Sequence, residues 1–178
     1  GQIPMAGYAD LMRFALLAHY GGTWIDATVY LTDSIPTAIT ESNFFAVRNS
    51  LLLIDNPVLY PAWFLHAKKG NKMIREIRNV AFAYWLKNEH VIEYLLPNLI
   101  ITQVIKSEPE AEQTMPYMNS DYSEHLVKIL GDDFSEDKWK WIKGLTGIHK
   151  LTYKLENKID KKGTFYRYII DGEKLLCQ

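Results

Sequence analysis

Three ionisable residues, Asp10, Arg13 and Asp26, lie in a stretch of the chain where apolar residues would normally stand. Residues 8–20 are otherwise mostly Ala, Leu, Met and Phe, which predicts a helix buried on most of its sides. Asp10 and Arg13 are three residues apart and therefore share one face of that helix. A buried carboxylate is costly unless a cation or a hydrogen-bond donor meets it. The pattern therefore indicates either a buried ion pair or a site that binds a polar ligand.

The Gly21-Gly22 pair predicts the end of this helix, because glycine readily adopts the backbone conformations that terminate helices. Residues 23–31 then alternate in a way that is typical of a strand. One face of this strand would carry Trp24, Asp26, Thr28 and Tyr30. Asp26 is therefore expected beside Thr28, in a place where its charge must be balanced.

This part of the chain resembles the donor-binding core of the GT-A glycosyltransferases, and in particular the capsular polysaccharide synthesis glycosyltransferases of the sugar-binding DXD group. The shared pattern is Ser/Ala-Asp-x-x-Arg on a helix, then Tyr-Gly-Gly-x-Trp/Tyr-x-Asp-x-Asp/Thr on a strand. This sequence carries it as Ala9-Asp10-x-x-Arg13, Tyr20-Gly21-Gly22-Thr23-Trp24 and Asp26-Ala27-Thr28. Further matches at 83–87, 92–94 and 148–154 extend the resemblance over residues 6–154.

The resemblance implies roles for the three charged residues. Asp10 would bind hydroxyl groups of the donor sugar or its ribose, and Arg13 would bind the sugar and the diphosphate. Asp26 would contact both the donor and a divalent metal ion, Mg²⁺ or Mn²⁺. Asp26 and Arg13 are the expected catalytic residues.

Other expected site residues come from the same resemblance. Thr28 stands where the second acid of the DXD motif usually binds the metal, and a hydroxyl is a poorer ligand than a carboxylate for such an ion. His149 would be a further metal ligand, and with Lys150 it would close over the diphosphate; a solvated turn is the alternative. Asn98 would face the sugar or the acceptor, with core hydrogen bonding as the alternative.

Composition agrees with one well-packed domain. The chain has 178 residues, of which 48% are hydrophobic and 13% aromatic, and these shares exclude a disordered protein. The single cysteine, Cys177, excludes a disulfide scaffold and indicates a reducing compartment such as the cytoplasm.

Charge is unevenly distributed along the chain. Residues 138–178 contain ten Lys or Arg and four Asp or Glu, a net charge of +6, whereas the remaining residues carry −7. A solvated basic surface is the ordinary interpretation. The more specific interpretation is peripheral contact with the inner face of a membrane or with a lipid-linked acceptor. No nucleic-acid recognition motif accompanies the charge, so we expect no nucleic-acid partner.

The expected architecture is α/β and GT-A-like, with a single domain over 1–178. Residues 6–154 would form the donor-binding and acceptor-side portion, and 155–178 a basic extension. Because the first nucleotide-binding strands of such a fold find no counterpart before Tyr8, we expect a C-terminal portion of a longer enzyme; strands supplied by another chain are the alternative. The expected elements after residue 36 are strands at 43–48, 62–67 and 163–171, helices at 71–87, 90–106 with a kink at Pro97, 123–130 and 135–141, and a turn at 107–112.

The expected function is transfer of a sugar from a nucleotide-diphosphate donor to a saccharide or lipid-linked acceptor in bacterial surface polysaccharide synthesis, with retention of anomeric configuration. A non-catalytic module that binds sugar nucleotides or glycans is the main alternative, because Thr28 replaces an acid. An assembly subunit that docks on a membrane is a further one.

Overall fold

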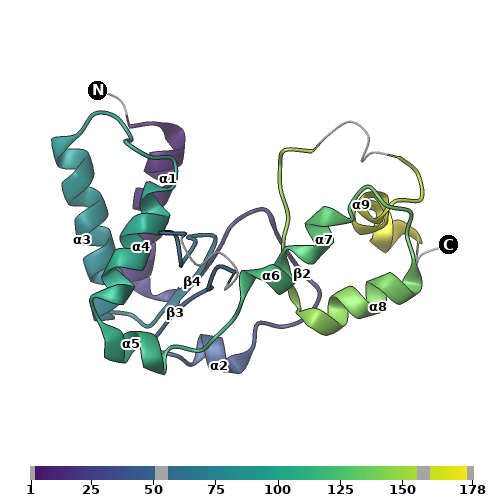
Figure 1. The fold of residues 1–178 in the computed structure, drawn as a ribbon, viewed down its shortest axis with the longest axis horizontal. Helices are drawn as coiled ribbons and strands as arrows, with labels where there is room; N and C mark the ends of the chain where they lie inside the picture. The colour runs from purple at the N-terminus through teal and green to yellow at the C-terminus, as the bar shows by residue number, and fades with distance from the viewer. Residues whose placement is uncertain (1–2, 51–55, 156–160, 176–178) are drawn as a thin grey trace. The chain divides into compact units, whose positions relative to one another are not determined.

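A computed structural model describes residues 3–50, 56–155 and 161–175, and Figure 1 shows its helices and strands. The fold is mixed α/β, as the sequence predicts. Its sheets are small and antiparallel. The chain forms two compact units: the first unit comprises Gly1–Asp26 and Pro36–Asn119, and the second unit comprises Ala27–Ile35 and Ser120–Gln178. The division of the chain into a domain over 6–154 and an extension over 155–178 stays a prediction.

The first unit contains a three-stranded antiparallel sheet in the order β1-β4-β3. Its elements are α1 (Met5–Tyr20), β1 (Gly22–Ile25), α2 (Thr37–Thr40), β3 (Phe44–Ala46), β4 (Phe64–Ala67), α3 (Lys72–Lys87), α4 (Leu96–Lys106) and α5 (Pro109–Thr114). Helix α1 packs against α3, and α3 packs against α4, so the three helices lie side by side (Figure 1). They share one apolar core with the sheet.

Apolar side chains from each of these helices meet the strand β4 in that core. Phe14 of α1, Leu65 of β4, Ile74 and Ile77 of α3 and Ile101 of α4 are all fully buried. Full burial of a side chain of this size contributes about 1.5–3 kcal/mol to stability. The core therefore holds α1, which carries the predicted site residues, firmly against the sheet.

Helix α3 begins where the sequence predicts. The Asn71 side chain accepts hydrogen bonds from the backbone N–H groups of Met73, at 2.8 Å, and Ile74, at 3.3 Å. These bonds satisfy two donors that the first turn of a helix leaves without partners. The predicted N-cap and the helix end at Lys87 are confirmed.

The predicted continuous strand over 23–31 is wrong. Strand β1 ends at Ile25 and pairs with β4, and the backbone N–H of Asp26 still donates to the Trp63 carbonyl at 2.9 Å. A separate strand, β2 (Val29–Leu31), pairs with β5 (Ile148–Lys150) in the second unit. Because the two strands pair with different partners, the alternation does not continue across residues 26–28.

The second unit is built around the β2–β5 pair. Its helices are α6 (Ser120–Ser123), α7 (His125–Lys128), α8 (Glu136–Leu145) and α9 (Phe165–Leu175). The predicted helix over 123–130 is thus two short helices, and the predicted helix after Ser135 extends beyond Trp141 to Leu145. Its core consists of Leu126, Leu130, Trp139, Ile142 and Phe165.

The predicted terminal strand over 163–171 is also wrong, because this segment forms α9. Its aromatic and β-branched residues favour a strand by propensity. In the structure Phe165, Tyr168 and Ile169, at a spacing of three and four, pack on the second unit's core. Burial of this helical face outweighs the local preference.

Two proline-containing segments differ from the prediction in the first unit. Helix α4 begins at Leu96 and has Pro97 in its first turn, where the missing N–H costs nothing, so there is no kinked helix over 90–106. The predicted turn over 107–112 is instead largely helix α5, which begins with Pro109.

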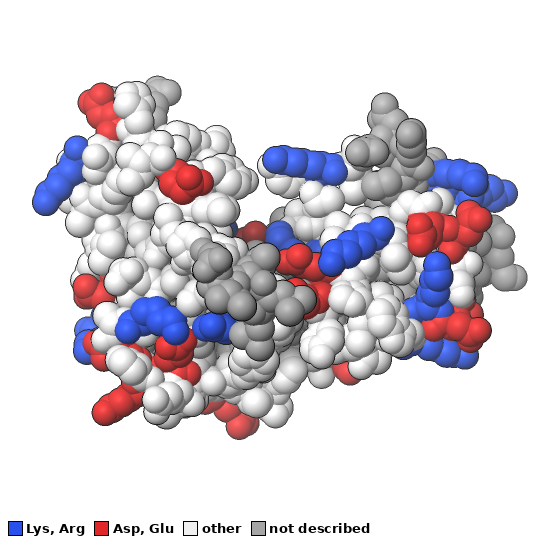
Figure 2. Space-filling model, in the orientation of Figure 1, with Lys and Arg blue, Asp and Glu red and all other residues white. Residues whose placement is uncertain are grey.

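Basic side chains of the second unit lie next to acidic ones. On the face drawn in Figure 2, Lys and Arg are interspersed with Asp and Glu. Lys138 lies 3.4 Å from Asp132, and Arg167 lies 2.9 Å from Asp171. These pairs fit the solvated basic surface, and contact with a membrane stays a prediction. Among the described residues, no helix combines the length and apolar character needed to cross a bilayer.

The turn between α1 and β1 generates a stability prediction. Gly21 and Gly22 both have positive φ, 72° and 98°. A Cβ on Gly21 would lie 2.5 Å from the Lys69 backbone nitrogen, whereas a Cβ on Gly22 would meet nothing within 4 Å. Gly22→Ala should therefore lower the free energy of unfolding by about 1–2 kcal/mol through backbone strain alone. Gly21→Ala should lower it by about a further 1–3 kcal/mol through the backbone clash.

Urea unfolding of the two variants beside the natural protein measures this difference. Gly22→Ala is the matched control, since it introduces the same methyl group in the neighbouring position. Equal losses in the two variants would contradict the close approach of Gly21 to Lys69.

Candidate functional site

The structure brings Asp10, Arg13 and Asp26 together. The Arg13 Nη1 atom lies 3.2 Å from Asp10 Oδ1, and Arg13 Nη2 lies 3.0 Å from Asp26 Oδ1. One guanidinium group therefore holds two carboxylates, one from its own helix and one from the end of β1. We call these three residues the charged cluster.

The local fold explains how the charged cluster forms. Asp10 and Arg13 are neighbours on α1 because they are three residues apart. The Gly21-Gly22 turn then reverses the chain, so that β1 contacts α1 and delivers Asp26 to the same place. The cluster thus depends on the glycine turn as much as on the helix.

Trp24 completes the surroundings of Asp26. Its indole Nε1 donates a hydrogen bond to Asp26 Oδ1 at 3.0 Å, and the Arg13 guanidinium carbon lies 5.2 Å from the Trp24 ring centroid. The Arg13 guanidinium therefore makes a cation–π interaction with Trp24 in addition to its ion pair with Asp26. The sequence predicts Trp24 and Asp26 on one strand face, because they are two residues apart, but it assigns no role to Trp24.

The charged cluster is partly accessible to solvent. The side chain of Arg13 is 10% exposed, that of Asp10 20% and that of Asp26 26%. Burial raises the pKa of Asp10 from 3.8 to about 6, the Arg13 charge opposes this rise, and the Asp26 charge adds to it. Asp10 is therefore a carboxyl group that titrates close to neutral pH, as often found in functional sites.

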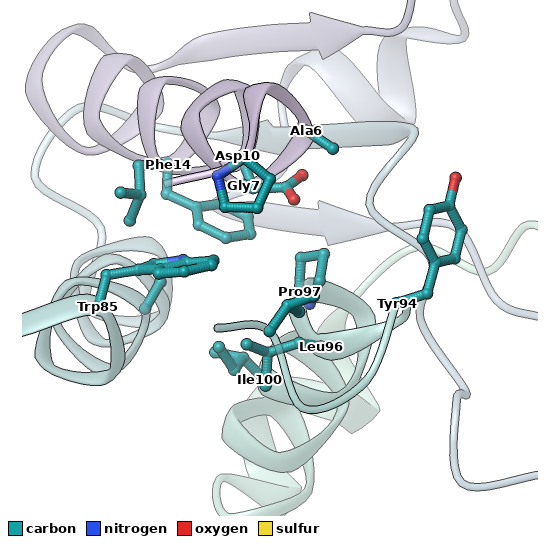
Figure 3. Close-up of a pocket in the computed structure, with 13 residues that line it drawn as sticks. Ala6, Gly7, Asp10, Phe14, Trp85, Tyr94, Leu96, Pro97 and Ile100 are labelled. Carbon is teal, nitrogen blue, oxygen red and sulfur yellow. The ribbon is translucent and has the colours of Figure 1, made fainter. Parts of the chain in front are cut away.

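A pocket of about 140 Å³ opens beside the cluster in the first unit (Figure 3). Asp10 lines it, whereas Arg13 and Asp26 do not. The other lining residues are Pro4, Ala6, Gly7, Leu11, Phe14, Ala81, Trp85, Val91, Tyr94, Leu96, Pro97 and Ile100. The Trp85 side chain packs against the core and also forms a wall of the pocket.

Thr28 belongs to the second unit, whereas Asp26 ends a segment of the first. The carbonyl of Thr28 accepts a hydrogen bond from the Leu151 N–H at 2.8 Å. The Lys150 ammonium group donates to the Thr28 hydroxyl. Thr28 and Lys150, which are 122 residues apart in sequence, are thus brought into contact by the β2–β5 pairing.

His149 is a buried strand residue of the second unit, so the alternative of a solvated turn is wrong. Its Nε2 atom lies 2.9 Å from the Thr32 hydroxyl, and its ring is fully buried between Tyr30 and Trp139. Burial lowers its pKa from 6.5 to about 4, so the ring is neutral at physiological pH. An enclosed ring of this kind is poorly placed to bind a metal or a diphosphate, and these roles stay predictions.

Asn98 has a structural partner. Its Oδ1 atom accepts a hydrogen bond from the Ala62 backbone N–H at 3.0 Å, which ties α4 to the segment before β4. The core hydrogen bond considered as an alternative is therefore present. A contact between Asn98 and a sugar or an acceptor stays a prediction.

Each residue expected to hold Mg²⁺ or Mn²⁺ has a protein partner within its own unit. Asp26 Oδ1 already accepts from Arg13 and Trp24, and the Thr28 hydroxyl is met by an ammonium group. Within the described ranges no three His, Cys, Asp or Glu side chains gather as a metal site would require. A metal requirement stays a prediction, and we derive no step through a metal.

The raised pKa of Asp10 generates a prediction about pH. The folded protein holds this proton more tightly than the unfolded chain, so ionisation of Asp10 lowers stability as pH rises from 4 to above 6. Asp10→Asn removes this pH-dependent loss. The difference in free energy of unfolding, variant minus natural protein, should therefore become more positive by on the order of 2 kcal/mol between pH 4 and pH 7.

Urea unfolding at pH 4, 5, 6 and 7 gives the comparison. Glu76→Gln, at an exposed position of α3, is the control, because it removes a carboxylate outside the charged cluster and leaves Asp10 in place. A pH-independent difference for Asp10→Asn would show that burial does not shift this carboxyl.

Comparison with known proteins agrees with the resemblance in its coarser part. No curated protein matches the chain. The family described as capsular polysaccharide synthesis protein matches residues 1–169, a range that includes the charged cluster, Thr28 and Lys150. This match covers almost the whole sequence, and the chain therefore belongs to the capsular polysaccharide synthesis protein family.

Proposed function

We propose that this protein is a glycosyltransferase of the GT-A type, which moves a sugar from a nucleotide-diphosphate donor to an acceptor in capsular polysaccharide synthesis. The observation that carries the proposal is the charged cluster, in which one arginine joins two partly exposed carboxylates. Membership of the capsular polysaccharide synthesis protein family supports the biological context.

The composition of the cluster favours ligand binding over a purely structural ion pair. Both carboxylates are partly exposed, Asp10 to 20% and Asp26 to 26%, so a ligand can reach their oxygens while Arg13 holds them in place. Sugar hydroxyls donate hydrogen bonds that satisfy carboxylate oxygens, and the guanidinium presents donors in a fixed plane. Asp10 and Asp26 would therefore hold the hydroxyl groups of a donor sugar, with Arg13 fixing their positions.

The reaction breaks the bond between the anomeric carbon and the diphosphate oxygen, which leaves with the bonding electrons. The acceptor hydroxyl oxygen bonds to the same carbon, and its proton passes to the departing diphosphate oxygen. Because the anomeric carbon becomes positive in the transition state, fixed carboxylates beside the sugar stabilise that charge. The arginine keeps them oriented, which is the positioning part of catalysis.

Several finer points remain our proposals. Retention of anomeric configuration follows from the resemblance, as does a diphosphate-binding role for Lys150. A saccharide or lipid-linked acceptor and a cytoplasmic, membrane-peripheral location follow from the biological context and the basic segment. Turnover measured with EDTA and with added Mn²⁺ or Mg²⁺ tests the metal expectation.

A non-catalytic module that binds sugar nucleotides or glycans is the alternative function. It would use the same cluster, and the hydroxyl at Thr28 in place of an acid favours it. Release of free nucleotide diphosphate in a screen of donors, made with the protein in its natural full length, distinguishes the two.

Substitution within the cluster tests the proposed function. Asp26→Asn keeps the size and an oxygen acceptor for Trp24 and Arg13, but it removes the charge. We expect turnover to fall by about 10² to 10³, the usual cost of losing one charge-stabilising group. Arg13→Ala should have a similar effect, and Thr28→Ala a milder one.

Initial rates of nucleotide diphosphate release, together with thermal melting, give the measurement. Glu76→Gln, which removes an exposed carboxylate far from the cluster in sequence, is the matched control and should retain full activity. Full activity in a well-folded Asp26→Asn would end the assignment of this site.

A further inference from the structure

The pocket beside Asp10 combines one charged side chain with apolar walls. Of the 13 residues that line it, Asp10 alone carries a charge, and most of the others are aliphatic or aromatic. Its volume of about 140 Å³ is below the roughly 300–1,000 Å³ of pockets that enclose a drug-sized ligand. The pocket can therefore receive a substituent of a ligand, not a whole nucleotide sugar.

The walls of the pocket come from α1, α3 and α4, from Pro4 before α1, and from Val91 and Tyr94 in the segment between α3 and α4. The Trp85 indole lies directly against α1 at Gly7, where an added Cβ would be 2.7 Å from the Trp85 Cζ2 atom. Figure 3 shows Phe14, Pro97 and Ile100 around the same space. A methyl group that enters this space leaves water for apolar contacts, whereas a hydroxyl group would lose its hydrogen bonds.

Asp10 connects the pocket with the charged cluster. Its Oδ1 atom is bound to Arg13, while the carboxyl group borders the pocket, where Figure 3 shows it between α1 and Pro97. A carboxylate accepts hydrogen bonds and donates none. The group that fits here therefore carries an N–H or O–H donor next to a methyl group.

We infer that the pocket receives the acetamido group of an N-acetylated donor sugar. The amide N–H donates to Asp10, and the acetyl methyl lies against Trp85. A 6-deoxy sugar also offers a methyl group, but the ring carbon that bears this methyl carries the ring oxygen and no N–H or O–H donor. The inference rests on the proposed function, since it takes the sugar held by the charged cluster as the donor.

Donor pairs that differ only at the acetamido group test the inference. The pairs are UDP-N-acetylglucosamine with UDP-glucose and UDP-N-acetylgalactosamine with UDP-galactose, and UDP-6-deoxyglucose with UDP-glucose forms the 6-deoxy arm. We expect kcat/KM to favour an N-acetylated donor by about 10- to 200-fold, the range for one small apolar group in a fitted pocket. Equal values within each pair, or a preference for the 6-deoxy donor, would overturn the inference.

Variants that fill the pocket test whether the pocket is the source of the preference for N-acetylated donors. Ala6→Phe adds a ring at an exposed lining position of α1, and Val91→Phe does so at another exposed lining position. Either should reduce the ratio of the two kcat/KM values toward one, without a change in melting temperature. Ala83→Phe, at an exposed position of α3 outside the pocket, is the control and should keep the ratio. A ratio unchanged in both pocket variants would place the preference elsewhere and overturn the inference.

A binding measurement separates this inference from the proposed function. Saturation-transfer NMR with free N-acetylglucosamine or N-acetylgalactosamine should show the strongest signal on the acetyl methyl, and Ala6→Phe should weaken it at least about threefold. This signal without turnover of any donor would support the pocket and contradict the transferase. Turnover without the methyl signal and without a donor preference would support the transferase and contradict the pocket.

Discussion

The ion pairs of Arg13 are the interaction on which the arrangement of the first unit's site depends. Its side chain, 10% exposed, joins a helix to the end of a strand through two carboxylates. Loss of one partner from a buried pair of this kind costs about 3–5 kcal/mol, because the remaining charge is left without compensation. The cluster therefore fixes the geometry of α1 against β1, and it exposes enough of each carboxylate for a ligand to reach.

The helical part of this arrangement could be predicted from sequence, because local signals and tertiary packing agree there. The apolar residues around Asp10 and the cap at Asn71 both specify helices that the structure contains. Prediction failed at 163–171, where burial of a helical face overrides the local preference for a strand. It also failed at Pro97, which lies in the first turn of α4 and does not kink a longer helix. The pocket could not be foreseen, because its walls come from three helices and a connecting segment that no local pattern relates.

The DXD-like segment illustrates the same limit at the site itself. Its spacing, Asp26-Ala27-Thr28, predicts two oxygens on one strand face. The structure instead ends one strand before Asp26 and begins another after Thr28, each paired within a different compact unit. The Thr28 hydroxyl is consequently met by Lys150, a contact over 122 residues that sequence spacing cannot indicate.

The pairing of β2 with β5 also has a consequence for how the chain is made. Val29 pairs with Lys150, 121 residues later, and the whole of Pro36–Asn119 is synthesised in between. At the usual 5–20 residues per second, a nascent β2 waits on the order of ten seconds for its partner to emerge from the ribosome. During that interval its backbone N–H and C=O groups are an open edge that other chains can pair with. Because β2 has only three residues, it offers few such groups, and its shortness limits mispairing before the second unit has formed.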